Sequence, residues 1–160
     1  MTNRRASCSC GQLNLTIDGD PARISMCHCL ECQRRTGAVI SNQARFRREQ
    51  ITFAGKSAAW TRTAESGNAI TFQFCPTCGS TVYWEGQGFP GYVMVAIGTF
   101  ADPNFPGPTI SGWEVSRHRW LTLPPDTPPA IAGSFTLRLR ANHRASPCAI
   151  AWSASAAPAP

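Results

Sequence analysis

Short runs of alternating apolar and polar residues recur along most of the chain up to Trp120. Runs with this period, bounded by glycine, proline or asparagine, are typical of β-strands that bury one face. The clearest ones cover residues 13–17, 69–74, 81–84 and 92–100, and weaker ones cover residues 38–41, 51–55, 58–63 and 112–116. The pattern predicts a mainly β domain of antiparallel strands.

One segment has a helical character instead. Residues 30–36, "LECQRRT", predict about two helical turns, and Gly37 is placed to end them with a left-handed cap. The segments 86–91 and 101–108 are rich in glycine and proline and are expected to be loops. We therefore expect one short helix within the β domain.

The composition changes after Trp120. A proline-rich stretch, "LPPDTPPAIAG", follows, and the chain ends in the low-complexity "SASAAPAP". We expect one compact domain over residues 1–123 and a Pro/Ala-rich tail over residues 124–160 that is largely disordered. Residues 135–140, "FTLRLR", alternate like a strand, and whether they join the sheet is left open.

The chain carries 15 Lys and Arg against 9 Asp and Glu, and every basic residue except Lys56 is arginine. This surplus suits a solvated surface or an anionic small molecule, and nucleic acid is disfavoured because basic and aromatic residues do not cluster together. No apolar run approaches the roughly 20 residues of a transmembrane helix or follows the N-terminal charges as in a signal peptide. We expect a cytoplasmic protein with no membrane partner, whose eight cysteines are metal ligands or reactive thiols rather than disulfides.

Two cysteine pairs lie far apart in the sequence, Cys8 and Cys10 in "CSCG" and Cys75 and Cys78 in "FCPTCGS". The second pair has the form of a metal-binding knuckle, in which a tight turn points backbone N–H groups at the sulfurs. Together the pairs supply the four soft ligands that Zn²⁺ prefers. They predict one closed, structural zinc site, with disulfides or iron as the alternatives.

A third group, Cys27, Cys29 and Cys32, lies in "SMCHCLECQRRTG". Three protein ligands with an open fourth position are typical of a catalytic zinc site. A thiol bound to such a metal is deprotonated at neutral pH, so the site could activate an incoming thiol as a nucleophile. The alternatives are redundant ligands of the structural zinc, or a cluster without metal.

Three further side chains near this cluster are candidates for the chemistry. For His28 we predict an acid/base or substrate-orienting role, with a metal ligand or a surface residue as alternatives. Arg34 and Arg35 are predicted to pair with a substrate carboxylate through the guanidinium fork, unless they form a solvated helix face. His118 and His143 show no partner pattern, and Cys148 is interpreted as a spare thiol.

The order of the motifs C-x-C-G, C-H-C-x-x-C-x-x-x-T-G, F-C-x-x-C-G-S and a late "RHRW" resembles the glutathione-dependent formaldehyde-activating family, also called the CENP-V/GFA domain. The resemblance covers about Ser7 to Trp120. It implies an Mss4-like β-tent around a structural zinc held by Cys8, Cys10, Cys75 and Cys78, and a second, catalytic zinc held by Cys27, Cys29 and Cys32. It further implies carbon–sulfur lyase chemistry, the reversible joining of the glutathione thiol to formaldehyde.

The predicted function is a lyase that uses two Zn²⁺ ions, with glutathione or another thiol and a small aldehyde as partners. The alternative is a non-catalytic zinc module that binds protein or nucleic acid. A zinc deaminase is excluded, because its H-x-E and P-C-x-x-C signatures are replaced by "HCLE" and "CPTC". A homodimer is left open.

Overall fold

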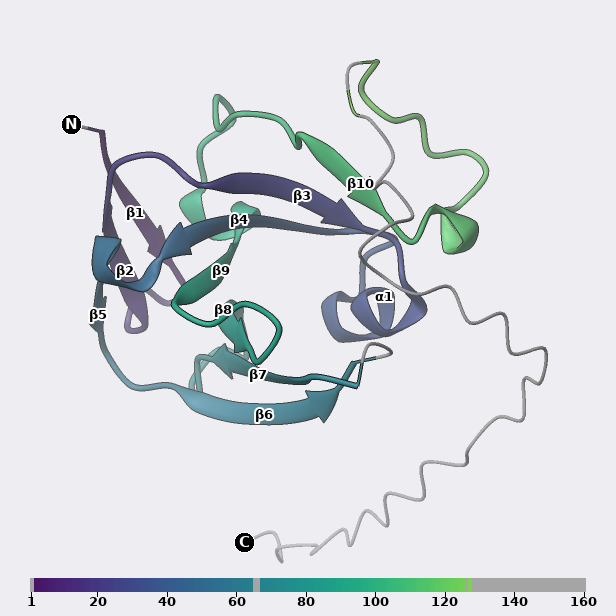
Figure 1. Ribbon diagram of the computed structural model, residues 1–160. Helices are drawn as coiled ribbons and strands as arrows, with labels where there is room; N and C mark the ends of the chain where they lie inside the picture. Colours follow the sequence, from purple (N-terminus) through teal and green to yellow (C-terminus); the bar gives the residue numbers. More distant parts are fainter. Residues whose placement is uncertain (1, 65–66, 126, 128–160) are drawn as a thin grey trace, which may run out of the picture.

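Two β-sheets and one short α-helix make up the described part of the chain, residues 2–64, 67–125 and 127 of this computed structural model (Figure 1). The smaller sheet has the strand order β1-β2-β5, and the larger has the order β10-β3-β4-β9-β8-β7-β6. The bounds are β1 Asn3–Ser7, β2 Asn14–Asp18, β3 Arg23–Cys27, α1 Leu30–Thr36, β4 Ser41–Arg47, β5 Ile51–Ala54, β6 Ala58–Thr63, β7 Ala69–Phe74, β8 Thr81–Gly86, β9 Tyr92–Ala96 and β10 Ile110–Gly112. Three 3₁₀ helices complete the order, η1 Arg48–Gln50, η2 Ile97–Phe100 and η3 Glu114–Ser116.

The mainly β prediction is confirmed, and the pairing is antiparallel with one exception. The short strand β10 runs parallel to β3, with Ser111 opposite Met26. All other strand pairs are antiparallel. Within the described ranges no helix is long and apolar enough to cross a bilayer.

Most predicted strands are present with bounds that agree to within two residues, but three predicted runs differ more. The strand expected at 92–100 ends at Ala96, where the chain turns into η2 and the Thr99 hydroxyl donates to the Ala96 carbonyl (2.6 Å). The strand expected at 38–41 is wrong, since β4 begins at Ser41 and continues to Arg47. The strand expected at 112–116 is also wrong, since β10 ends at Gly112 and η3 follows.

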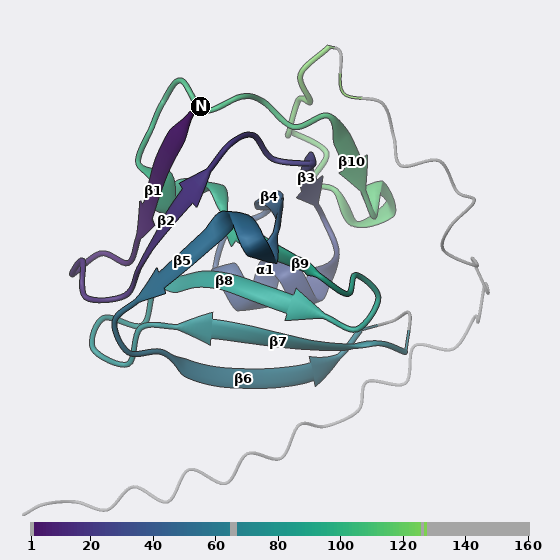
Figure 2. The ribbon, with the colours of Figure 1, turned by 60° about the vertical axis from the view of Figure 1, so that its left-hand side comes forward.

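The main core lies between the two sheets, which face each other as Figure 2 shows. Alternate residues of β2, β4 and β9 supply it, and Leu15, Ile17, Phe46, Val93 and Val95 are fully buried. Burying such side chains contributes about 1.5–3 kcal/mol each, so this core is the main source of stability. It holds the smaller sheet in place against the larger one.

A second, smaller cluster lies on the other face of the larger sheet. Phe72, Trp84 and Met94 are buried there on three adjacent strands, directly opposite one another in the register. Trp60 on β6 extends this row, stacked on Phe72 at 5.7 Å between ring centroids. The row forms an aromatic surface beside α1.

The helix α1 lies in the connection between β3 and β4, with the bounds that the sequence predicts. Cys29 caps its first turn, accepting a hydrogen bond at Sγ from the Cys32 N–H (3.3 Å). Gly37 ends it in the left-handed conformation (φ 67°), as predicted. Because β3 and β4 pair in register, with Cys27 opposite Ser41, the helix and its cysteines are placed at the end of the larger sheet.

Part of the sequence prediction concerns residues outside the described ranges. The strand-like residues 135–140, His143 and Cys148 are among them, as is the tail from residue 128 onward. The domain boundary at residue 123 stays a prediction.

Candidate metal centres

The four cysteines assigned to one structural site come together in the structure. Cys8 and Cys10 lie in the turn between β1 and β2, and Cys75 and Cys78 lie in the turn between β7 and β8. All four Sγ atoms lie within 4.8 Å of one another, with 3.5 Å between Cys8 and Cys10 and 3.6 Å between Cys10 and Cys75. Tetrahedral Zn²⁺ with Zn–S bonds of about 2.3 Å places its sulfurs about 3.8 Å apart. The four residues therefore fit a zinc ion.

Neutral hydrogen-bond donors surround these sulfurs. The Leu13 N–H donates to Cys8 Sγ (3.3 Å), and the Thr77 N–H and the Gln12 amide donate to Cys75 Sγ (3.4 and 3.2 Å). Interaction with Ser80 lowers the pKa of Cys78 to about 5. Such donors stabilise the thiolate form that binds metal. Sequence reasoning missed Gln12, although it directly follows the motif "CSCG" of the first pair.

The second cluster consists of Cys27 at the end of β3, Cys29 at the helix cap and Cys32 in the first turn of α1. Their three Sγ atoms lie within 4.8 Å of one another. Within residues 2–64, 67–125 and 127, no fourth cysteine, histidine or carboxylate joins the group. The two clusters are thus separate, one with four ligands and one with three, and each can hold a metal ion such as zinc.

The three thiols of the second cluster differ in acidity. Hydrogen bonds from the thiols of Cys27 and Cys32 are the main cause that lowers the pKa of Cys29 to about 2, and the charge of Arg62 contributes to this shift. Its hydrogen bond to Cys29 and its burial raise the pKa of Cys27. Cys29 is therefore the first of the three to become a thiolate, which is the form that ligates metal.

His28 lies between two of these cysteines in sequence, but its side chain is fully buried (0% exposed). Its Nε2 is 3.2 Å from the Ser111 hydroxyl on β10, and its Nδ1 is buried with no hydrogen-bond partner in the described chain. Burial lowers the pKa of His28, which favours the neutral imidazole. The structure places this ring against β10, and the predicted acid/base or orienting role stays a prediction.

Gln33 on α1 connects the second cluster to the segment that follows β10. Its Nε2 donates to the carbonyls of His28 (2.8 Å) and Ser116 (3.0 Å), and its Oε1 lies 3.1 Å from Nε2 of His118. Sequence reasoning missed Gln33 and found no partner for His118. The late "RHRW" motif was the available signal that this region matters.

The two arginines predicted to bind substrate have different surroundings. Arg34 is exposed and forms an ion pair with Glu31 on the same helix. Arg35 is half-buried, donates to the Ser41 hydroxyl (2.8 Å), and lies 4.7 Å from the ring centroids of both Phe72 and Trp84. Burial lowers the pKa of Arg35, and the nearby Cys32 opposes that effect. Of these two arginines, Arg35 is therefore the one that interacts with the cysteines.

A second arginine near the cluster was not predicted. Arg62 on β6 is half-buried and lies 5.7 Å from the Phe72 ring centroid, and its charge acts on Cys29. The sequence places Arg62 in a predicted strand, but only the pairing of β6 with β7 brings it to this site.

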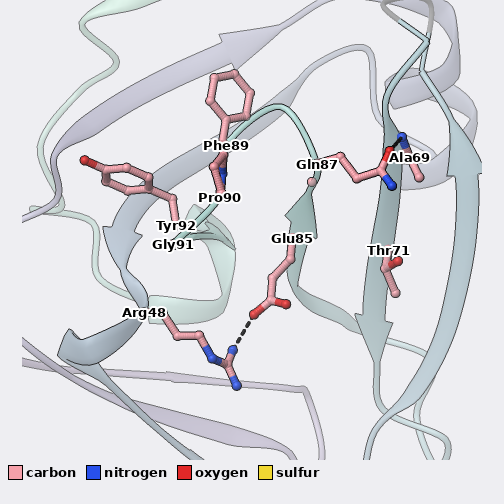
Figure 3. Close-up of a pocket in the computed structure, with 10 residues that line it drawn as sticks. Arg48, Ala69, Thr71, Glu85, Gln87, Phe89, Pro90, Gly91 and Tyr92 are labelled. Carbon is pink, nitrogen blue, oxygen red and sulfur yellow. Dashed lines mark hydrogen bonds and ion pairs between the residues drawn. The ribbon is translucent and has the colours of Figure 1, made fainter.

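A cavity of about 420 Å³ lies beside Arg35, a size suited to a small ligand. Its walls come from the end of α1, the start of β4 and the turn after Cys78, and they include Arg35, Ser41, Asn42, Gly79 and Ser80. A second cavity of about 400 Å³ is lined by Phe89, Tyr92 and the ion pair of Arg48 with Glu85 (Figure 3). No cysteine lines either cavity, and the first one is the candidate ligand site because Arg35, on the same helix as Cys32, lines it.

Two sulfur clusters held by a pair of β-sheets define the class: a mainly β protein with two separate cysteine centres, each able to hold a metal ion. Comparison with protein families matches residues 3–116 to GFA, described as glutathione-dependent formaldehyde-activating enzyme, and the chain belongs to this family. The fold is consistent with the Mss4-like architecture that the resemblance implies. A crystal structure of a Rhodobacter sphaeroides protein is similar in fold, with 19% identity, a TM-score of 0.50, and coverage of 62% of this chain and 90% of that one. The comparison with curated proteins finds no match.

Proposed function

We propose that the protein is a zinc-dependent carbon–sulfur lyase that forms and cleaves the adduct of a small aldehyde with an anionic thiol, glutathione in the type reaction. The observation that carries the proposal is the three-cysteine cluster without a fourth protein ligand among the described residues. Arg35, on the same helix as Cys32, lines a cavity of about 420 Å³. Membership of the GFA family supports the same reaction class.

Cys27, Cys29 and Cys32 would hold the catalytic zinc, since their sulfurs are close enough to share one ion. Zinc at such a site supplies Lewis acidity that keeps a coordinated thiol deprotonated at neutral pH. The four-cysteine cluster has a complete ligand set and would hold a structural ion.

The residues of the chain position the thiol and exclude water. The cavity takes the body of the thiol, and the Arg35 guanidinium pairs with its carboxylate. The thiolate sulfur then bonds to the carbonyl carbon of the aldehyde, while the carbonyl electron pair moves to oxygen, which takes the proton that the thiol released. The reverse step breaks the C–S bond. His28 acts in this proposal as a positioning residue, because an acid/base role needs contact with substrate or solvent.

The test uses the full chain with its zinc content measured. Wild type should bind two zinc ions per chain, one of which responds to glutathione, and should accelerate exchange between formaldehyde, glutathione and their adduct, followed by NMR. Cys29→Ser should retain one zinc and lose at least about 100-fold in exchange rate, in keeping with a lost metal-activated nucleophile.

Unchanged exchange by Cys29→Ser with the other site fully loaded would contradict the proposed mechanism. One tightly held zinc in wild type, with no response to thiols, would instead indicate the structural module that the sequence leaves as the alternative.

A further inference from the structure

Two arginines flank the three-cysteine cluster without a carboxylate partner among the described residues. Arg35 and Arg62 both lie against the ring of Phe72, at 4.7 and 5.7 Å from its centroid. The ion pairs in this part of the chain use other arginines: Arg4, Arg34, Arg47 and Arg48. Two like charges on one ring repel each other, and partial burial adds a desolvation cost, so this arrangement calls for a nearby negative charge.

The cysteine sulfurs are the negative groups that face these arginines. The charge of Arg35 interacts with Cys32 and Cys27, and that of Arg62 interacts with Cys29. The four-cysteine cluster differs, because the hydrogen-bond donors to its sulfurs are backbone N–H groups and the Gln12 amide, and Cys78 itself donates to the Ser80 hydroxyl. Among the described residues, the cluster with three ligands has two arginine charges that act on its sulfurs.

Of the two arginines, Arg35 belongs to α1 and is held in place by three contacts. The Ser41 hydroxyl accepts a hydrogen bond from Arg35 (2.8 Å), and the rings of Phe72 and Trp84 both contact its guanidinium. Phe72 and Trp84 are opposite each other on β7 and β8, and Trp60 stacks on Phe72 from the edge strand β6. The aromatic row therefore fixes the position of the charge and shields it partly from water, which strengthens its effect.

The charge balance indicates what these cations are for. A divalent ion with three thiolates leaves one net negative charge, and a fourth sulfur ligand in its thiolate form raises this to two. We propose that Arg35 and Arg62 compensate the charge of that fourth sulfur, so that the cluster selects a thiolate over neutral water as its exchangeable ligand. The inference rests on the proposed function for the identity of the ligand, and it assigns to Arg62 a role in specificity.

The test measures thiol binding rather than turnover. The full chain is loaded with Co²⁺, and binding of 2-mercaptoethanol, a thiol with an uncharged body, is followed by sulfur-to-cobalt charge-transfer absorption. Arg35→Gln and Arg62→Gln should each weaken binding about tenfold, the effect of one charge lost at a partly shielded site. Arg35→Lys and Arg62→Lys should keep most of the affinity. Arg34→Gln, an exposed residue of the same helix, is the matched control and should bind like wild type.

Cobalt absorption from the four-cysteine cluster reports whether each variant is folded. If a glutamine variant does not fold, the matching lysine variant is compared with wild type instead. Wild-type affinity for 2-mercaptoethanol in both glutamine variants would overturn the inference and leave the lyase proposal standing. If those variants lose affinity for glutathione alone, the arginines contact substrate carboxylates only, and the inference also fails. A wild-type protein that binds no thiol would overturn the lyase proposal and the inference together.

Discussion

Replacing Gln33 with leucine removes three hydrogen bonds that join the helix of the three-cysteine cluster to the segment after β10. The amide nitrogen donates to two carbonyls, at 2.8 Å to His28 and 3.0 Å to Ser116, and the amide oxygen accepts from Nε2 of His118 at 3.1 Å. Leucine has a similar volume but no polar atoms, so both carbonyls lose their side-chain donor. The change therefore tests the connection and not the packing.

The size of the effect follows from the count of lost bonds. Each hydrogen bond contributes about 1 kcal/mol net, so three account for about 3 kcal/mol. If the whole free-energy loss destabilises the arrangement of Cys29 and Cys32, metal affinity at this cluster falls by up to about 100-fold, since 1.4 kcal/mol corresponds to a factor of ten. Removal of a side chain that hydrogen-bonds to a metal ligand typically lowers metal affinity by about 10- to 100-fold, which agrees with this value.

The assay is zinc release to a colorimetric chelator from protein loaded at both clusters. Two kinetic phases are expected, and Cys29→Ser and Cys75→Ser assign them to the two sites. Gln33→Leu should accelerate only the phase of the three-cysteine cluster. Gln50→Leu is the matched control, because Gln50 also makes three hydrogen bonds, to Arg47 N–H and to the carbonyls of Asp18 and Asp20, away from both clusters. Equal release rates for Gln33→Leu and wild type would refute the reasoning.

Two further predictions concern the four-cysteine cluster. Cys75→Ser should lose one zinc per chain and lower the melting temperature by roughly 10 °C or more, measured by circular dichroism, because metal binding there is coupled to folding; wild-type melting would exclude a structural ion. Gly55→Ala should lower the free energy of unfolding in urea by more than about 2 kcal/mol, because a Cβ at Gly55 would lie 1.7 Å from the Gln12 carbonyl oxygen. The control is Gly91→Ala, also at positive φ but with no atom near the new Cβ, which should lower it by about 1 kcal/mol. Equal losses for the two alanine variants would count against the close contact.

Local signals were enough to predict several elements from the sequence. The end of α1 follows from Gly37, the strand β7 follows from clear alternation, and β6 follows from a weaker run of the same kind. The strand β4 was missed beyond its first residue, because its alternation is carried by arginine: Arg45 and Arg47 alternate with the buried Ala44 and Phe46. Alternation with charged residues is a weak strand signal when the side that is buried is unknown.

The candidate site could be predicted only as far as spacing allows. The three groups of cysteines are visible as short motifs, and their division into clusters of four and three follows from ligand count. Gln33 and Arg62 could not be predicted in the same way. Their partners, His118 and Phe72, are distant or on another strand, and only the strand register decides which side chains meet.

The four-cysteine cluster connects residues 65 positions apart, with the sulfurs of Cys10 and Cys75 at 3.6 Å. An ion bound there closes a long loop, and the loss of chain entropy on closure restricts all the residues within the loop in one step. The loop contains β3, α1 and β4, and hence the whole three-cysteine cluster. We therefore expect the two ions to bind in a fixed order during folding, the ion of the four-cysteine cluster first. When zinc is limiting, the chains should then carry zinc in the four-cysteine cluster and none in the three-cysteine cluster, rather than a mixture of chains loaded at one cluster or the other.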